Sequence, residues 1–464
     1  MKYVIILKGE IMENYSLMKN AKITSLLWKF SLPAIVAMLI NALYNIIDRV
    51  FVGHAVDLGT NGLAAMTVVF PIFMIIMAVS LTCGVGGAAL FSISMGEKKY
   101  KKANNIIGNA FALAIILNLL IAVFFFIFMD PVLRKFGASE VVLPYSKAYL
   151  AIILGGAVIQ GWVLTGNNLI RANGSPLISM LSIILGVCLN CVLAPLFIYV
   201  FKWGMTGCGL ATVMGMFCSA VWVYHYFYKS QHHFTFKKLR LRKDLSKGII
   251  MTGLPAFCIQ FAGSAFNMVL NASLIKYGGD IAVSSMGLVN SIQTLLVLPI
   301  IGLNQGALPI IGFNYGAKIY QRVIDTVKIT MVIATVMAVV GFIITHSLNK
   351  EIIMIFNHDP DLIKMGSTFL WIWFLCFPVV GIGMVGGNFF QSIGKPLPAI
   401  ILSLTRQVII LIPLIFLLAN VYKLHGVVMA QPIADVSSTL ISATCLYISL
   451  RKLKRLLKAE KNAE

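Results

Sequence analysis

Apolar stretches of about 20 residues recur along the whole chain, and this feature constrains the fold more than any other. A helix needs about that length to cross roughly 30 Å of hydrocarbon. We count about twelve such stretches, in a sequence that is 59% hydrophobic and only 11% charged. We therefore predict an all-α membrane protein. The helices are expected to begin near Trp28, Gly62, Asn104, Ala148, Leu177, Gly207, Gly248, Val283, Thr326, Ser367, Leu397 and His425.

The sequence holds 37 Lys and Arg against 16 Asp and Glu, a formal net charge of +21. Such a charge would suit nucleic acid, but its distribution follows the predicted helices. With the N-terminus in the cytoplasm, inner segments carry 27 of the 37 basic residues and outer loops carry eight. Cytoplasmic loops of membrane proteins show this excess. We expect both termini in the cytoplasm, basic segments that contact anionic lipid headgroups, and no nucleic-acid partner.

The second half of the sequence repeats the first at an offset of about 220 residues. Such a repeat indicates two homologous lobes of six helices each. Parallel repeats with a site between them are typical of transporters in which one helix bundle rocks against the other. The matching pairs are Pro33 with Pro255, Asn45 with Asn267, Gly96 with Gly316, Asn168 with Asn388, Gly174 with Gly394, Pro195 with Pro413 and Gly207 with Gly426.

The repeat and the charge distribution together predict five segments. No hydrophilic interval among them is long enough for a separate soluble domain. The segments are a cytoplasmic N-terminal segment (1–27), a first six-helix lobe (28–228), a basic cytoplasmic linker (229–247), a second six-helix lobe (248–449) and a basic cytoplasmic tail (450–464).

Asp48 lies well inside the first predicted helix, where a charge is costly and usually functional. Asn41, Asn45 and Asp48 are spaced by four and three residues, so they share one helix face. Arg49 points about 100° away from that face and is not expected to neutralise Asp48. The carboxylate can exchange a proton or a monovalent cation as access to it alternates. Its alternative role is that of a structural hydrogen-bonding anchor.

Four further polar residues fall inside predicted helices. Asn190 and Thr212 reach a depth comparable to that of Asp48, although such residues also serve as simple helix–helix hydrogen bonds. Arg406 and Asp435 fall near mid-depth on the last two helices, where a buried ion pair either lines a substrate site or fixes the helix packing. The eight cysteines lie within predicted helices, which favours a packing role, and we expect no resident metal or cofactor.

The sequence resembles the MATE (multidrug and toxic compound extrusion) family, in its MepA-like bacterial branch. The resemblance covers the chain from about Leu26 to Leu450. It is carried by the order and duplication of several short stretches. These are Leu43 to Gly53, Met95 to Glu97, Asn168 to Gly174, Gly302 to Gly316, Phe389 to Pro396, Leu402 to Gln407 and Gln431 to Asp435.

The resemblance implies a V-shaped pair of six-helix lobes in a bacterial cell membrane that exports lipophilic cations in exchange for protons or sodium. We expect the protein to act as a monomer. The family's first-span carboxylate corresponds to Asp48, its fifth-span asparagine to Asn190 and its sixth-span threonine to Thr212. This sequence departs from related members at Ala194, where many of them carry a second carboxylate before a proline. Because a sodium site prefers several hard oxygen ligands, protons are favoured over sodium as the coupling ion.

Three other functions remain open from the sequence. A flippase for a lipid-linked saccharide precursor would belong to the same superfamily, but it would require a cationic centre to hold a pyrophosphate. A channel would lack saturable flux against a gradient. An intramembrane enzyme would require a catalytic constellation, and we find no His-Glu-x-x-His motif in the sequence.

Overall fold

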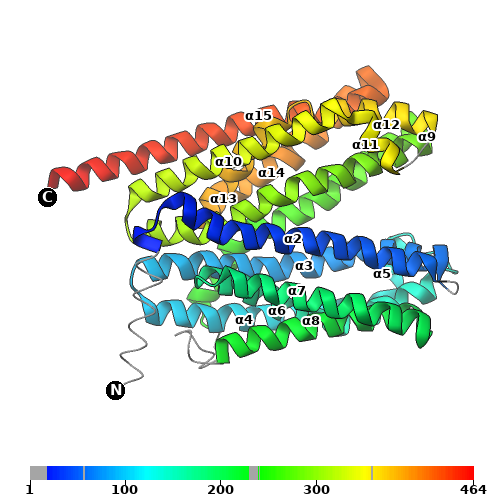
Figure 1. The fold of residues 1–464 in the computed structure, drawn as a ribbon, viewed down its shortest axis with the longest axis horizontal. Helices are drawn as coiled ribbons and strands as arrows, with labels where there is room; N and C mark the ends of the chain where they lie inside the picture. The colour runs from blue at the N-terminus through cyan, green and yellow to red at the C-terminus, as the bar shows by residue number, and fades with distance from the viewer. Residues whose placement is uncertain (1–17, 56–57, 229–238, 240, 357–358, 464) are drawn as a thin grey trace. The chain divides into compact units, whose positions relative to one another are not determined.

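The computed structural model describes residues 18–55, 58–228, 239, 241–356 and 359–463. Every regular element in these ranges is helical (Figure 1), as expected from the sequence. Residues 1–17 of the predicted N-terminal segment and most of the basic linker lie outside the described residues, and the last residues of that segment already belong to α2. The chain divides into two compact units, one built mainly from residues 36–257 and the other from residues 22–35 and 258–464.

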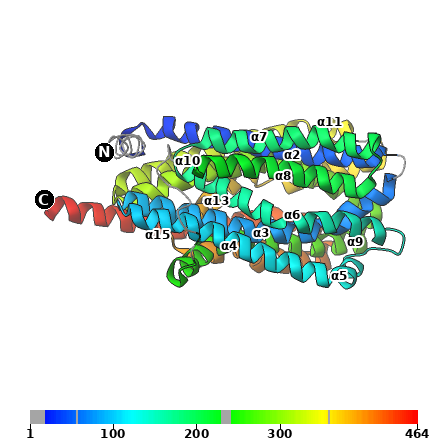
Figure 2. The ribbon, with the colours of Figure 1, turned by 90° about the horizontal axis from the view of Figure 1, so that it is seen from below.

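The N-terminal unit is a bundle in which α3 packs against α4 and α6, and α8 packs against α6 and α7. Figure 2 shows α7 and α8 running side by side. Pro176 and Gly204 begin α7 and α8, and a short π-helix η1 follows Pro195. The elements are α2 (Ile23–His54), α3 (Gly59–Gly96), α4 (Tyr100–Ile127), α5 (Met129–Lys135), α6 (Leu143–Ala172), α7 (Pro176–Pro195), η1 (Leu196–Val200) and α8 (Gly204–Tyr228).

The C-terminal unit repeats this plan, with α13 packed against α10 and α15. A seven-residue π-helix, η3, joins α14 to α15 and packs on α15. Its elements are α9 (Lys243–Gly316), α10 (Tyr320–Ser347), α11 (Asn349–Phe356), α12 (Pro360–Trp373), α13 (Phe377–Ser392), α14 (Pro396–Leu404), η3 (Thr405–Leu411) and α15 (Ile412–Ala463).

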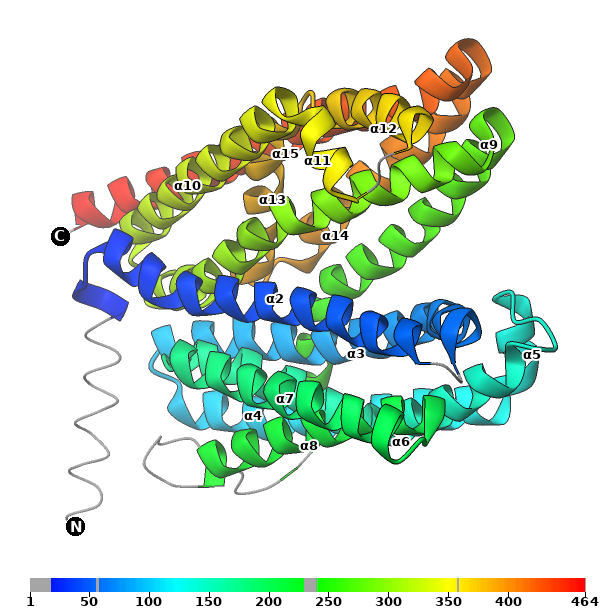
Figure 3. The same ribbon diagram turned by 45° about the vertical axis from the view of Figure 1, so that its right-hand side comes forward.

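Among the described residues, up to ten helical stretches are long and apolar enough to cross a membrane when the bent pair α12–α13 counts as one. Two of them contain a break, because Gly279 in α9 and Lys423 in α15 have non-helical backbone angles. Figure 3 shows α9 turning back on itself at its break. Counting the helices on either side of each break gives twelve crossings, the number expected from the sequence.

The backbone itself carries the internal repeat. Eight of the ten described residues with a positive φ form four pairs separated by 220 or 221 residues, and four of the eight are lysines, which rarely adopt this conformation. Each pair ends or interrupts a helix at the same point of the two units. The pairs are Gly59 and Gly279, Lys98 and Lys318, Gly174 and Gly394, and Lys202 and Lys423.

The compact units differ from the predicted lobes at the first residues of α2 and α9. Residues 22–35 of α2 belong to the C-terminal unit, and residues 243–257 of α9 belong to the N-terminal unit. In the N-terminal unit, the start of α9 approaches α3 so closely that a Cβ on Gly253 would lie 1.8 Å from the Thr82 carbonyl oxygen. In the C-terminal unit, a Cβ on Gly306 would lie 2.3 Å from Ser31 Oγ. Ser31 and Gly253 are repeat counterparts.

Candidate functional site

The Asp48 side chain is buried inside the N-terminal unit, at 3% exposure. The Cys208 thiol on α8 lies 3.7 Å from both carboxylate oxygens and donates to them. A thiol is a weak donor. Among the described residues Asp48 has no ion-pair partner, since the neighbouring Arg49 is exposed and lies 5.9 Å from the Phe70 ring centre. The carboxylate is therefore buried with little to stabilise its charge.

Thr212 connects the polar groups around this carboxylate. Its hydroxyl oxygen accepts a hydrogen bond from Asn190 Nδ2 at 3.3 Å and lies 3.2 Å from the Tyr44 hydroxyl. The hydroxyl also donates to the Cys208 carbonyl oxygen at 3.1 Å. Asn190 and Thr212 are 3% and 4% exposed. The structure thus links Asp48, Asn190 and Thr212, on α2, α7 and α8, through Cys208.

Two members of this network, Tyr44 and Cys208, were not expected from the sequence. Both lie four residues before a predicted site residue, Tyr44 before Asp48 and Cys208 before Thr212. Residues four apart share one helix face. That spacing was the available signal, but a tyrosine and a cysteine in an apolar helix are common enough that it did not single them out.

Two residues predicted to line the site do not join this network through any described hydrogen bond. Asn41 and Asn45 are exposed on α2, and Asn45 Nδ2 donates to the Asn41 carbonyl oxygen at 2.7 Å. Ala194 is the position at which the sequence departs from the family that it resembles. It is fully buried in a small apolar cluster with Phe197 and Ala211.

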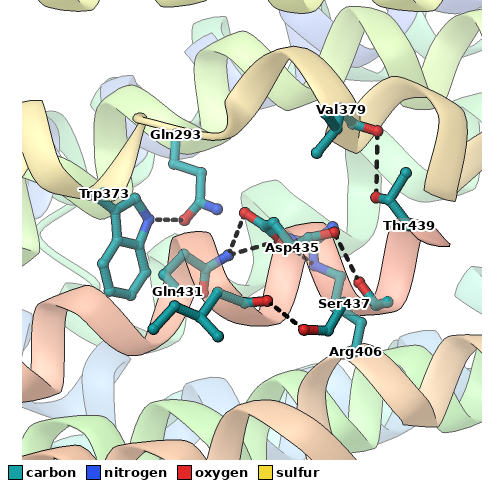
Figure 4. A network of polar contacts seen from close by, with 10 residues as sticks. Gln293, Trp373, Val379, Arg406, Gln431, Asp435, Ser437 and Thr439 are labelled. Atoms are coloured by element: carbon teal, nitrogen blue, oxygen red, sulfur yellow. Dashed lines mark hydrogen bonds and ion pairs between the residues drawn. The ribbon is translucent and has the colours of Figure 1, made fainter. Parts of the chain in front are cut away.

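The C-terminal unit has a polar cluster of its own, centred on Asp435 (Figure 4). Arg406 Nε on η3 lies 3.1 Å from Asp435 Oδ1, so the two residues form the ion pair considered from the sequence. Gln431 Nε2 donates to both carboxylate oxygens at 3.2 and 3.1 Å. Nearby, the Trp373 indole donates to Gln293 Oε1 at 3.2 Å. Trp373, Gln293 and Gln431 were not predicted.

A cation held beside Asp48 would have oxygen ligands, whereas Asp435 is already paired with Arg406. In the N-terminal unit these are the Asp48 carboxylate, the Asn190 amide oxygen and the Thr212 hydroxyl. Oxygen ligands suit hard monovalent cations rather than zinc or copper. Within the described ranges, no group of three or more His, Cys, Asp or Glu side chains lies together as a metal site.

Duplicated bundles of membrane-length helices, each enclosing a charged side chain, define the class of polytopic membrane transporters. The sequence model of the MatE family matches residues 33–196 and 255–417. The two matches begin 222 residues apart, which confirms the internal duplication. The chain belongs to the MatE family, as its resemblance to MATE transporters implied.

Relatives and solved structures agree with this assignment. The chain is 27% identical over 437 residues to a protein of Staphylococcus haemolyticus named Multidrug export protein MepA, covering 93% of this chain and 95% of that protein. It is 26% identical over 423 residues to the Staphylococcus aureus protein of that name, covering 90% and 92%. The fold matches the outward-facing structure of a multidrug resistance MATE family transporter with a TM-score of 0.88 at 22% identity, covering 98% and 99%.

Proposed function

We propose that this protein is a secondary active antiporter that exports lipophilic, mostly cationic compounds from a bacterial cell in exchange for protons. It acts as a monomer in the cell membrane, with both termini in the cytoplasm. The relatives named as multidrug export proteins support export of several drugs. The observation that carries the coupling is the burial of Asp48 beside a weak thiol donor, without an ion-pair partner in the described part of the chain.

The proposed role of Asp48 follows from its charge. An ionised carboxylate in this position attracts a proton or a cationic substrate, and either one neutralises it. Binding of the two is therefore mutually exclusive, which is the requirement for exchange when access alternates between the two sides. In this proposal Asn190, Thr212 and Tyr44 form a hydrogen-bond network that holds α2, α7 and α8 in register around the carboxylate.

The flippase alternative is less consistent with these contacts. A pyrophosphate would require uncompensated positive charge in the interior. The polar network of the N-terminal unit instead holds the negative charge of Asp48. Its buried Arg171 lies in the last turn of α6, away from this network, and donates to Asn168, while Arg406 in the C-terminal unit is paired with Asp435.

A flux measurement tests the proposed antiport. Inverted membrane vesicles containing the protein are expected to accumulate rhodamine 123, a lipophilic cation, when their interior is acidic. Accumulation should stop when nigericin collapses the pH gradient, and an imposed sodium gradient alone should not drive it. Vesicles without the protein are the control. Accumulation driven by sodium and insensitive to nigericin would contradict proton coupling.

The coupling ion can also be examined at Ala194. In Ala194→Asp a second carboxylate would lie one turn beyond Asn190, in the apolar cluster of Phe197 and Ala211. A buried charge without a partner costs about 3 kcal/mol or more. We therefore expect a lower Tm in sodium-free buffer, and partial recovery with sodium because bound sodium stabilises the folded protein.

The matched control is Ala194→Asn, which has nearly the same size and no charge. It should show no sodium-dependent change in Tm, like the natural protein. If Ala194→Asp is also insensitive to sodium, position 194 is not part of a cation site, and its alanine does not explain a preference for protons.

A further inference from the structure

The ion pair of Arg406 and Asp435 is incomplete on its arginine side. A guanidinium offers five N–H donors and binds a carboxylate best through two parallel hydrogen bonds. Here Arg406 approaches Asp435 through Nε alone, at 3.1 Å, and Nε is not aligned for a hydrogen bond. Asp435 is the ion-pair partner of Arg406 among the described residues. The forked end of the guanidinium therefore remains available to another acceptor.

Gln431 shows that the cluster is organised around a charged Asp435. An ionised carboxylate only accepts hydrogen bonds, so the amide turns its NH₂ group toward both carboxylate oxygens. This orientation leaves Gln431 Oε1 buried without a hydrogen-bond partner, in a side chain that is only 2% exposed. A buried acceptor without a partner is costly. A hydrogen-bond donor that entered the cluster could satisfy Gln431 Oε1. Protonation of Asp435 would have the same effect, because the Gln431 amide could then rotate and accept a hydrogen bond from the carboxyl group.

The accessibility of the three side chains differs in a way that suits a binding site. Asp435 and Gln431 are almost fully buried, whereas the Arg406 side chain keeps 25% of its surface exposed. A ligand that approaches the cluster therefore meets the guanidinium first. Arg406 lies in the π-helix η3, and π-helical insertions occur frequently at functional sites.

The repeat places this cluster at a position equivalent to the network around Asp48. Gln431 lies 219 residues after Thr212, the same offset that separates Gly207 from Gly426. Thr212 connects the polar groups of the N-terminal unit, and Gln431 contacts the carboxylate in the C-terminal unit. The two units therefore carry polar groups at the same place on their sixth helix. One unit holds a single negative charge and the other holds a neutral pair.

We infer that the Arg406–Asp435–Gln431 cluster binds the carboxylate group of zwitterionic amphiphilic substrates, and that this binding is accompanied by protonation of Asp435. The ligand carboxylate replaces Asp435 as the ion-pair partner of Arg406, and Asp435 gains one proton from solvent. The charge of the cluster is zero before and after, because Arg406 and the ligand carboxylate then form the ion pair. The protonated Asp435 can donate to Gln431 Oε1, which gives this oxygen its partner.

The proton is assigned to Asp435 after considering the groups on each element packed against α15. Arg406 on η3 and the Cys376 thiol, between α12 and α13, face Asp435. Helices α13 and α14 contain no charged residue. The charged residues of α12, Asp361 and Lys364, lie within its first five residues. Those of α10, Arg322, Asp325 and Lys328, lie within its first nine residues, and His346 is the last residue but one of that helix. Of the residues facing the cluster, Asp435 is the carboxylate that can exchange its ion-pair partner.

A pair of dyes that differ only in one carboxyl group tests this inference. Rhodamine 110 has a free carboxylate, and rhodamine 123 is its methyl ester. With the purified full-length protein, the affinity for rhodamine 110 relative to that for rhodamine 123 is expected to rise about tenfold for each pH unit of acidification while Asp435 is ionised in the free protein. Calorimetry in two buffers of different ionisation enthalpy should show that rhodamine 110 takes up one proton more per bound dye than rhodamine 123, because any proton exchanged at Asp48 by the cationic ring system is common to both dyes.

Two variants assign the effect to the cluster. Arg406→Gln with Asp435→Asn keeps the interior neutral and should weaken rhodamine 110 binding about 30-fold or more, while rhodamine 123 binding changes less than about twofold. Asp435→Asn alone should keep rhodamine 110 binding but lose the additional proton relative to rhodamine 123. No binding of rhodamine 110 to the natural protein, binding that takes up no more protons than rhodamine 123 does, or equal binding to the double variant would each overturn the inference.

The inference rests on the proposed function only in treating the ligand as a transported compound, and the two fail separately. If rhodamine 123 is not exported, the proposed antiport fails whatever rhodamine 110 does. If rhodamine 123 is exported and the double variant binds rhodamine 110 as tightly as the natural protein does, the proposed antiport is retained and the carboxylate site is rejected.

Discussion

Replacing Asp48 with asparagine is expected to reduce accumulation of rhodamine 123, driven by an acidic interior, to the level of vesicles without the protein. Asn has nearly the shape of Asp and can still accept from Cys208, but it cannot bind and release a proton near neutral pH. Because no other carboxylate lies in the network of Asn190, Thr212 and Tyr44, the remaining groups cannot take over the exchange. The measurement is vesicle accumulation at matched protein levels.

The matched control is Asp130→Asn, the same substitution on the short helix α5. Asp130 is half exposed and pairs with Lys147, and a surface ion pair contributes roughly 0 to 1 kcal/mol. This variant should accumulate the dye like the natural protein. Both variants should have a Tm close to that of the natural protein. Normal accumulation by Asp48→Asn under a pH gradient would show that the coupling proton is carried elsewhere.

The sequence predicts most of this fold because its strongest signals are local. Length and hydropathy identify a helix that must cross lipid, where the backbone has to satisfy its own hydrogen bonds. The duplication then follows from aligned residues such as Pro33 and Pro255, and the structure shows it again in Lys98 and Lys318, which share a positive φ. The helix starts were expected a few residues too late, since polar ends such as Lys243 extend the helices beyond the apolar stretch.

The candidate site could be predicted only in part, because its contacts join distant helices. Asp48 was conspicuous as a charge in an apolar helix. Cys208 and Gln431 are not conspicuous, and their importance comes from contacts with carboxylates that the fold brings to them. Cys208 is 160 residues away from Asp48 in sequence. No periodicity within one helix can show such a partner.

The division of α2 and α9 between the two compact units was also invisible in the sequence. Both helices continue without interruption through the boundaries at 35–36 and 257–258. What sets these boundaries is the close packing of each helix start on another helix. In the N-terminal unit, the backbones of α3 and α9 approach each other at Gly86 and Gly253. Small residues allow such close approach between helices in membranes, where packing replaces the hydrophobic effect.

Gly253→Val is therefore expected to remove most of the folded protein from the membrane. The first side-chain carbon would lie 1.8 Å from the Thr82 carbonyl oxygen and within 3 Å of the Thr82 Cα and carbonyl carbon. These are backbone atoms of α3, so the clash can be relieved only by moving α9 away from α3. Overpacking inside a core typically costs 1 to 3 kcal/mol, and a backbone clash of this kind should cost at least about the upper value. The yield of monodisperse protein and its Tm, measured by size-exclusion chromatography of a fluorescent fusion, report the loss.

Gly287→Val is the control that separates the clash from the general effect of valine in a helix. Gly287 also lies in α9, but a Cβ there would meet no atom within 4 Å. Both substitutions replace a helical glycine with the same residue, so differences in helix propensity cancel. Gly287→Val should behave like the natural protein. If the two variants have the same yield and Tm, the start of α9 does not pack tightly on α3 in the folded protein, and residues 243–257 do not belong to the N-terminal unit.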